Sequence, residues 1–227
     1  MTAVVKENSG VRTKTDAAYD HLRRCLLGGI YQPGSRVVLD QVAVELGFSK
    51  VPVREAVTRL IGEGWLVNSP HVGPTVPVLT PEEVSETAII RGSLERTAVF
   101  HAVSHHDPQS YAELAALLDA MDRSLERSDL DFPDLNRQFH AAIIAPCPYS
   151  QLTALTASMM EKTLRYQTVR RVPEYQLKTQ QEHHAIFRAV LARDAKLASE
   201  LVEQHILSAS EALHEALLVS REMSVPT

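Results

Sequence analysis

Short helical patterns separated by glycine-containing turns dominate the first eighty residues. Residues 15–27 carry apolar side chains at helical spacing before two glycines, which predicts a helix that ends there. A second, short helix is predicted around residues 42–46. Ser49 is a suitable N-cap for a third helix that runs to about Ile61, with Pro52 in its first turn. The apolar positions expected to be buried in the first two helices are Ala18, Leu22, Cys25, Leu26, Val42, Ala43 and Leu46.

Two short β-strands are predicted after these helices. Residues 65–67 and 75–78 are rich in valine and aromatic or aliphatic residues, and the loop between them, residues 68–74, contains glycine and proline. The predicted order is therefore helix, helix, helix, hairpin.

From Thr80 onward the sequence predicts long helices. Thr80 and Glu83 form a capping-box pattern with Pro81 at the first helical position. Helix starts are expected near Thr80, Asp107, Asp131 or Asp134, Pro148, Pro173 and Asp194, and the last four helices are expected to end near Pro146, Arg171, Ala192 and Val219. Six such helices with short loops predict an antiparallel bundle, so the fold class is mainly α.

Charge separates the two halves of the chain. The 227 residues carry a net charge of −5. Residues 1–80 hold 9 basic and 7 acidic residues, and residues 81–227 hold 14 and 21. A slightly basic module next to an acidic one is compatible with a nucleic-acid-binding unit joined to another domain.

Membrane-span, signal-peptide and cysteine patterns narrow the possible class of protein further. No apolar run approaches the roughly 18 residues that span a bilayer, and the first residues lack a signal-peptide pattern. We therefore expect a cytoplasmic protein without a membrane partner. Cys25 and Cys147 belong to no Cys-x-x-Cys pair and are interpreted as small core residues.

The third predicted helix has two distinct faces. Its apolar face is formed by Val53, Val57, Leu60 and Ile61. Lys50, Arg54 and Thr58 recur every four residues on another face. This arrangement fits a helix-turn-helix whose recognition helix enters the major groove, with the hairpin as a wing. A solvated polar face on a small helical domain is the alternative.

Histidines occupy inward positions of three bundle helices. His140 lies one turn after Asn136, and His183 shares a face with Ile186. His205 is placed on a stripe with three apolar residues, namely Leu197, Leu201 and Ala212. Three imidazoles and an amide oxygen suit a divalent metal such as zinc, nickel or cobalt if they converge. Separate core histidines, each with one hydrogen-bond partner, are the alternative.

Several motifs over residues 13–78 resemble the winged-helix domain of the GntR family of bacterial transcription regulators. The matching stretches are residues 31–36, 42–49, 51–60 and 64–66. The resemblance implies DNA contacts from Lys50 and Arg54, and a wing tip near His71 and Gly73 that reaches the minor groove. The full set of expected DNA-binding residues is Arg36, Ser49, Lys50, Arg54, Thr58, His71 and Gly73.

Residues 82–218 resemble the FCD ligand-binding domain that follows this winged helix in the FadR subfamily. The matching motifs are residues 91–95, 136–140, 182–186 and 204–206, and six helices point to the shorter, VanR-like form. The resemblance implies a metal, most simply zinc or nickel, held by Asn136, His140, His183 and His205. Asn136 stands where the family usually has Asp. The implied effector is a small carboxylate or sugar acid, held by Arg91, His140, His183 and His205 with or without the metal.

The expected domains are a flexible N-terminus (1–12), a winged helix-turn-helix (13–79), an effector-binding and dimerisation bundle (80–219) and a C-terminal tail (220–227). Together they predict a homodimeric, ligand-responsive transcription regulator, most simply a repressor, that binds an inverted-repeat operator. A metal-dependent enzyme built on the bundle is an alternative. A DNA-binding protein whose bundle only dimerises is another.

Overall fold

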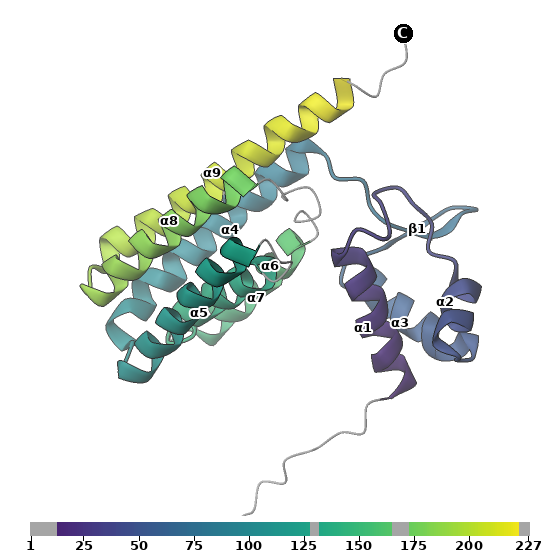
Figure 1. Cartoon of the computed structure of the whole chain (residues 1–227), viewed down its shortest axis with the longest axis horizontal. Coiled ribbons are helices and arrows are strands. Elements are labelled where there is room, and N and C mark those ends of the chain that lie inside the picture. Colours follow the sequence, from purple (N-terminus) through teal and green to yellow (C-terminus); the bar gives the residue numbers. More distant parts are fainter. Residues whose placement is uncertain (1–12, 128–131, 165–172, 223–227) are drawn as a thin grey trace, which may run out of the picture. The chain divides into compact units, whose positions relative to one another are not determined.

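The computed structural model describes residues 13–127, 132–164 and 173–222 (Figure 1). The chain divides into two compact units, Met1–Val78 and Leu79–Thr227. The predicted flexible N-terminus lies outside the described residues, as do the last five residues of the predicted tail.

Three helices and a hairpin form the first unit, in the predicted order. They are α1 (Lys14–Leu27), α2 (Leu39–Leu46), α3 (Lys50–Gly62), β1 (Val67–Ser69) and β2 (Gly73–Thr75). A capping box between Thr13 and Asp16 starts α1, whereas α2 stops because Gly47 adopts φ +65°, a conformation that side chains with a Cβ disfavour. The predicted buried residues of these two helices are buried except Leu46, which is half-buried.

The strands lie closer to the turn than the sequence predicts, and the predicted loop over residues 68–74 is wrong except for residues 70–72, because residues 68–69 and 73–74 belong to the strands. β1 and β2 are antiparallel, with Val67 opposite Thr75 and Ser69 opposite Gly73. The predicted start of the first strand is wrong, because the amide of Trp65 bonds the carbonyl of Leu60 at the end of α3 and its side chain packs in the core. The predicted second strand is also wrong beyond Thr75, because the amide of Val76 donates to the Ser35 carbonyl instead of to β1.

Six α-helices are described in the second unit. They are α4 (Pro81–Ala102), α5 (Pro108–Arg127), α6 (Phe132–Ile144), α7 (Ser150–Leu164), α8 (Pro173–Leu191) and α9 (Ala195–Glu222), with a 3-10 turn, Val103–His105, after α4. The Thr80–Glu83 capping box is present in full, and the carboxylate of Asp194 caps α9. The predicted end of the fourth bundle helix, near Arg171, lies outside the described residues.

Helices α4 and α9 pack along each other, with α8 beside α9 and α5 against α6 and α8 (Figure 1). The main core of this unit draws on all six helices, and Phe139, Met121 and Ile186 are among its fully buried side chains. Among the described residues, no helix is both long enough and apolar enough to cross a bilayer.

The buried stripe of α9 differs from the predicted one. Leu197 is 45% exposed and Ala212 is also exposed, so this part of the prediction is wrong. The stripe that faces the core consists of Ala198, Val202, His205, Ile206, Ala209 and Leu213. Both stripes contain His205, and helical periodicity alone does not decide which of the neighbouring faces packs against α4. His205 is therefore buried as expected, but the residues buried with it on α9 differ from the predicted ones.

Candidate DNA-binding surface and metal centre

Helix α3 buries one face and exposes the other, as its sequence pattern predicts. Its buried side chains are Val53, Ala56, Val57 and Leu60, and the predicted core residue Ile61 is half-buried. Lys50, Arg54 and Thr58 are exposed on the other face. Such a helix, held by α1 and α2 through its apolar face, offers cationic and hydroxyl side chains to a partner.

The exposed residues of α3 differ in their local contacts. Lys50 pairs with Asp40 of α2 through a 2.9 Å contact between Nζ and Oδ2. The Thr58 hydroxyl donates to the Arg54 carbonyl at 2.9 Å. Ser49 is the N-cap residue, but its side chain makes no capping hydrogen bond. Arg54 lines a surface depression together with Val51, Glu55, Thr58 and Arg59.

The remaining predicted DNA-binding residues lie at the hairpin. His71 is exposed at the tip with φ +62°, and Gly73 begins β2 with φ +96°. Both positive φ values belong to the tight turn that joins the strands. Arg36 is exposed and forms a β-bridge with Thr75, so its backbone extends the edge of the hairpin.

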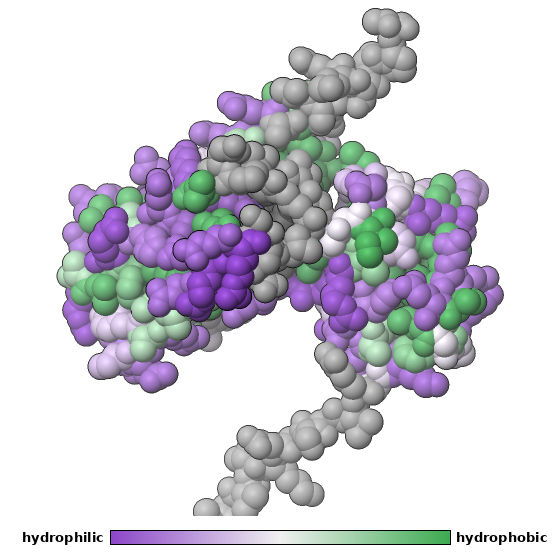
Figure 2. All heavy atoms as spheres, viewed as in Figure 1, coloured by the Kyte–Doolittle hydropathy of each residue, from purple (hydrophilic) through white to green (hydrophobic). Residues whose placement is uncertain are grey.

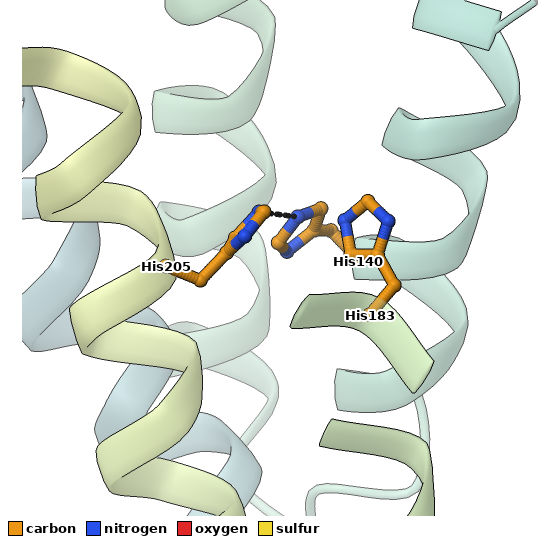
Figure 3. Close-up of side chains that lie close together, drawn as sticks. All are labelled: His140, His183 and His205. Carbon is orange, nitrogen blue, oxygen red and sulfur yellow. Dashed lines mark hydrogen bonds between the residues drawn. The ribbon is translucent and has the colours of Figure 1, made fainter. Parts of the chain in front are cut away.

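Three histidines converge inside the bundle. His140 comes from α6, His183 from α8 and His205 from α9, and Figure 3 shows the three rings gathered in one space. One ring nitrogen from each lies within 4.8 Å of the others, and all three side chains are buried. The three rings therefore converge, which the spacing in the sequence could not establish.

The distance between two of these nitrogens matches shared coordination. Nε2 of His140 lies 3.2 Å from Nε2 of His205 (Figure 3). Two imidazole nitrogens bound to one tetrahedral zinc at about 2.05 Å would be about 3.3 Å apart. The two rings therefore already have the separation that a common ion requires.

Two polar atoms of the predicted metal ligands have no hydrogen-bond partner among the described residues. They are Nε2 of His183 and Oδ1 of Asn136, and both are buried. Asn136 precedes His140 by one turn of α6, so the two side chains lie on the same face. Buried acceptors without partners are costly, and a cation among the rings would satisfy Nε2 of His183. The three converging imidazoles fit a divalent transition metal.

Glu95 of α4 is a site residue that the sequence prediction missed. Its carboxylate is fully buried and accepts from Nδ1 of His140 and, at 2.9 Å, from Nε of Arg91. Nη1 of Arg91 also donates to the Thr163 hydroxyl at 3.2 Å. The predicted effector-binding residue Arg91 is therefore next to the histidines, but its guanidinium is already engaged by Glu95. An Arg and a Glu one turn apart on a buried helix face were the available signal.

Two residues of α8 complete the surroundings and were also missed. Glu182 reaches α9, where its carboxylate accepts from Nδ1 of His205 at 2.7 Å. Gln180 faces Nδ1 of His183 at 3.2 Å. His184, the neighbour of His183, turns away and contacts Asp122 of α5. Sequence spacing placed one histidine of the pair inside but gave no indication of which residues would hold it.

The environment disfavours the protonated forms of His140 and His183. Burial lowers the pKa of His183 well below its ordinary value, and the nearby His205 and His140 act in the same direction. Burial also lowers the pKa of His140, although Glu95 opposes it. For Glu95, burial would raise the pKa, but the charge of Arg91 and the hydrogen bonds from His140 and Arg91 lower it. Neutral imidazole is the form that binds metal.

Figure 2 shows hydrophilic and hydrophobic residues interspersed on one face of the bundle. The three histidines are buried, with exposures of 0% for His140 and His183 and 5% for His205. Low exposure strengthens every charge interaction inside the site.

Comparison with known protein families gives two matches along the chain. Residues 14–76 match the profile described as bacterial regulatory proteins, gntR family. Residues 86–208, more than half of the chain, match the profile of the FCD domain.

Individual relatives agree with these profiles. The transcriptional regulator McbR of Escherichia coli is 37% identical over 54% of this chain, an alignment that spans 56% of McbR. The transcriptional repressor GlaR of Escherichia coli is 28% identical over 88% of this chain and 95% of GlaR. The solved structure of E. coli McbR/YncC superposes with a TM-score of 0.77 at 26% identity and covers 90% of this chain and 99% of that one.

Proposed function

The chain belongs to the GntR family of bacterial regulatory proteins and carries an FCD domain, and we propose that it is a metal-assisted, ligand-responsive repressor. The observation that carries the proposal is that one chain contains both an exposed cationic face, on α3, and a buried three-histidine cluster, in the second unit. The first feature suits DNA, and the second suits a small ligand. The site of action would be the cytoplasm, where the bacterial chromosome lies.

Operator binding is assigned to the first unit. Lys50 and Arg54 would enter the major groove, where Arg reads guanine through two hydrogen bonds, while Thr58 would contact a phosphate or a thymine methyl. His71 and Gly73 at the wing tip would approach the minor groove, and Ser49 and Arg36 would contact the backbone. A homodimer would place two such units on an inverted repeat.

Effector binding is assigned to the second unit. Zinc or nickel would be held by His140, His183, His205 and the Asn136 oxygen. A metal bound only by neutral donors keeps its positive charge and supplies a Lewis-acidic position that favours an anionic ligand. We therefore propose a small carboxylate or sugar acid as the effector. Arg91 adds positive charge nearby, although Glu95 balances it.

Coupling between the two units would follow from differential binding. An effector that binds one arrangement of the bundle more tightly shifts the dimer toward it and changes the spacing of the recognition helices. Relief of repression is the proposed direction, and the relative GlaR is named a repressor. The alternative of an enzyme has no support from the family, whose members are described as regulatory proteins.

The first test is the metal content of untagged protein, followed by DNA selection. Protein purified without chelator should hold about one transition metal per chain. Genomic fragments that the native protein selects should share an inverted repeat, and binding should weaken as salt increases. A His140→Ala and His183→Ala double variant should lose the metal while keeping DNA binding. A well-folded protein without metal would contradict the metal, and failure to select any sequence would contradict the operator.

A further inference from the structure

Each histidine of the cluster is held by its Nδ1 atom, and we propose that Glu95, Glu182 and Gln180 are positioning residues that leave all three Nε2 atoms facing the metal. The inference rests on the proposed metal site and goes further by assigning the tautomer and the coordinating atom of each ring. It also gives Arg91 a different role, as the anchor of Glu95 instead of a clamp on the effector.

His140 is held most firmly of the three. Its Nδ1 donates to one oxygen of Glu95, and the other oxygen of Glu95 accepts from Arg91. The hydroxyl of Thr163 on α7 holds the guanidinium in turn. This chain links α6 to α4 and α7, and all its members are buried. An ionised carboxylate can only accept, so the single proton of the neutral ring stays on Nδ1.

The ring of His205 is also held through its Nδ1 atom, by a different carboxylate. Its Nδ1 lies 2.7 Å from Glu182, which projects across from α8. Glu182 is partly exposed, with 29% of its side chain accessible, and Lys178 lies 3.9 Å from its other oxygen. Nδ1 of His205 is therefore the proton-bearing atom, and Nε2 is left with its lone pair.

Gln180 plays the corresponding part for His183. Its Nε2 lies 3.1 Å from the Leu118 carbonyl and 2.8 Å from the Asp122 carboxylate, and both of these groups are acceptors. The amide nitrogen must therefore point toward α5, and the amide oxygen points toward Nδ1 of His183 at 3.2 Å. His183 thus carries its proton on Nδ1 as well, which agrees with the unpartnered Nε2.

The three assignments together create a site that requires a cation. With both protons on Nδ1, the 3.2 Å contact between Nε2 of His140 and Nε2 of His205 brings two lone pairs together. Neither atom can donate to the other, and His183 adds a third lone pair nearby. A metal ion bound to the three Nε2 atoms removes this repulsion. Two carboxylates and one amide behind the rings then raise their basicity as ligands.

The tautomers can be measured without any metal. We would record nitrogen-15 spectra of histidine-labelled, chelator-treated full-length protein at neutral pH, with assignments from single His→Gln variants. The expected result is a protonated Nδ1 and an unprotonated Nε2 for all three residues. Protonation of Nε2 on His140 or His205, or a doubly protonated ring at either position, would overturn the inference even if the protein binds metal.

Cobalt(II) affinity supplies the second measurement. Glu182→Gln and Glu95→Gln should each weaken Co²⁺ binding by about 10- to 100-fold, the usual cost of losing such a carboxylate. Gln180→Leu, which removes a neutral acceptor, should cost less. The matched control is Glu203→Gln, since Glu203 pairs with Arg96 at the surface. Equal affinities for native protein, Glu182→Gln and the control would contradict the role assigned to the carboxylates.

The outcomes separate this inference from the proposed function. A native protein that binds no Co²⁺ would contradict the metal function, and the tautomer spectra would still decide whether the three residues orient the rings. Bound Co²⁺ should shift three exchangeable N–H proton resonances, one per ring. Should Glu95→Gln fail to fold, Glu182→Gln retains the test, because that side chain is partly exposed.

Discussion

Lys50 and Arg54 are both exposed cations on α3, but different contacts constrain them. Lys50 is paired with Asp40, whereas the Arg54 side chain borders an open depression on the helix surface. An exposed ion pair is worth little by itself, yet it competes with DNA for the lysine charge. The two residues should therefore contribute to binding in different ways.

Arg54→Ala should cost about 1 to 3 kcal/mol of operator binding and relax the base preference at one position in each half-site. The measurement is a binding titration against the selected operator and its single-base variants. Arg123→Ala, an exposed arginine of α5, is the control and should leave affinity unchanged. Equal loss on every operator variant would mean that Arg54 contacts only phosphate.

Asp40→Asn should strengthen binding to all DNA sequences. The substitution frees Lys50 from its ion pair while keeping the shape of the side chain, and the gain should be about 0.5 to 1 kcal/mol at low salt. Binding to operator and to unrelated DNA would be compared over a salt series. The control is Asp119→Asn, at an exposed position of α5, which changes the net charge by the same amount. The same gain in both variants would assign the effect to net charge instead of to Lys50.

Helix α9 shows how periodicity and packing contribute at the scale of an element. Its sequence supports two neighbouring apolar stripes that share His205, and packing against α4 selects the stripe that contains Val202. The hairpin gives a similar lesson. Trp65 was expected in a strand because of its residue type, but the end of α3 binds its amide and the core takes its side chain.

The choice of stripe can be tested by a pair of substitutions. Val202→Ala removes a fully buried side chain and should lower the free energy of unfolding by about 2 kcal/mol. Leu197→Ala removes a larger side chain that is 45% exposed and should cost about 0.5 kcal/mol or less. Urea denaturation of both variants provides the comparison. A larger loss for Leu197→Ala would favour the stripe that the sequence predicts.

At the scale of the whole molecule, several buried histidines of the second unit make its free energy of unfolding depend on pH. Burial lowers the pKa of His106, His140 and His183 in the folded state. The unfolded chain takes up protons on these residues as the pH falls below about 6.5, while the folded chain does not. Stability is therefore retained at neutral pH and is lost on acidification.

Metal-free protein should lose stability between about pH 7 and about pH 5, with His140 alone contributing about 2 kcal/mol. Glu95 adds to this loss only at lower pH, because its pKa is lowered in the folded state, and its contribution to stability is lost as the pH falls below the ordinary carboxyl range toward that lowered pKa. Chemical denaturation of chelator-treated protein at several pH values, with proton uptake on unfolding measured at each, tests the sign. A stability that does not change over this interval would contradict neutral burial of these histidines.

The sequence by itself determined the order of the elements, the two faces of α3 and the three helices that supply His140, His183 and His205. These features depend on local periodicity and capping, which neighbouring residues settle. The tertiary structure decided the rest, because the partners of His140 and His205 come from other helices, and Gln180, which shares α8 with His183, is oriented by Leu118 and Asp122 of α5. Glu95 lies 45 residues from His140, and Glu182 lies 23 residues from His205. Packing of α4, α6, α8 and α9 brings these side chains together, and only this packing determines which nitrogen of each ring is left for a metal.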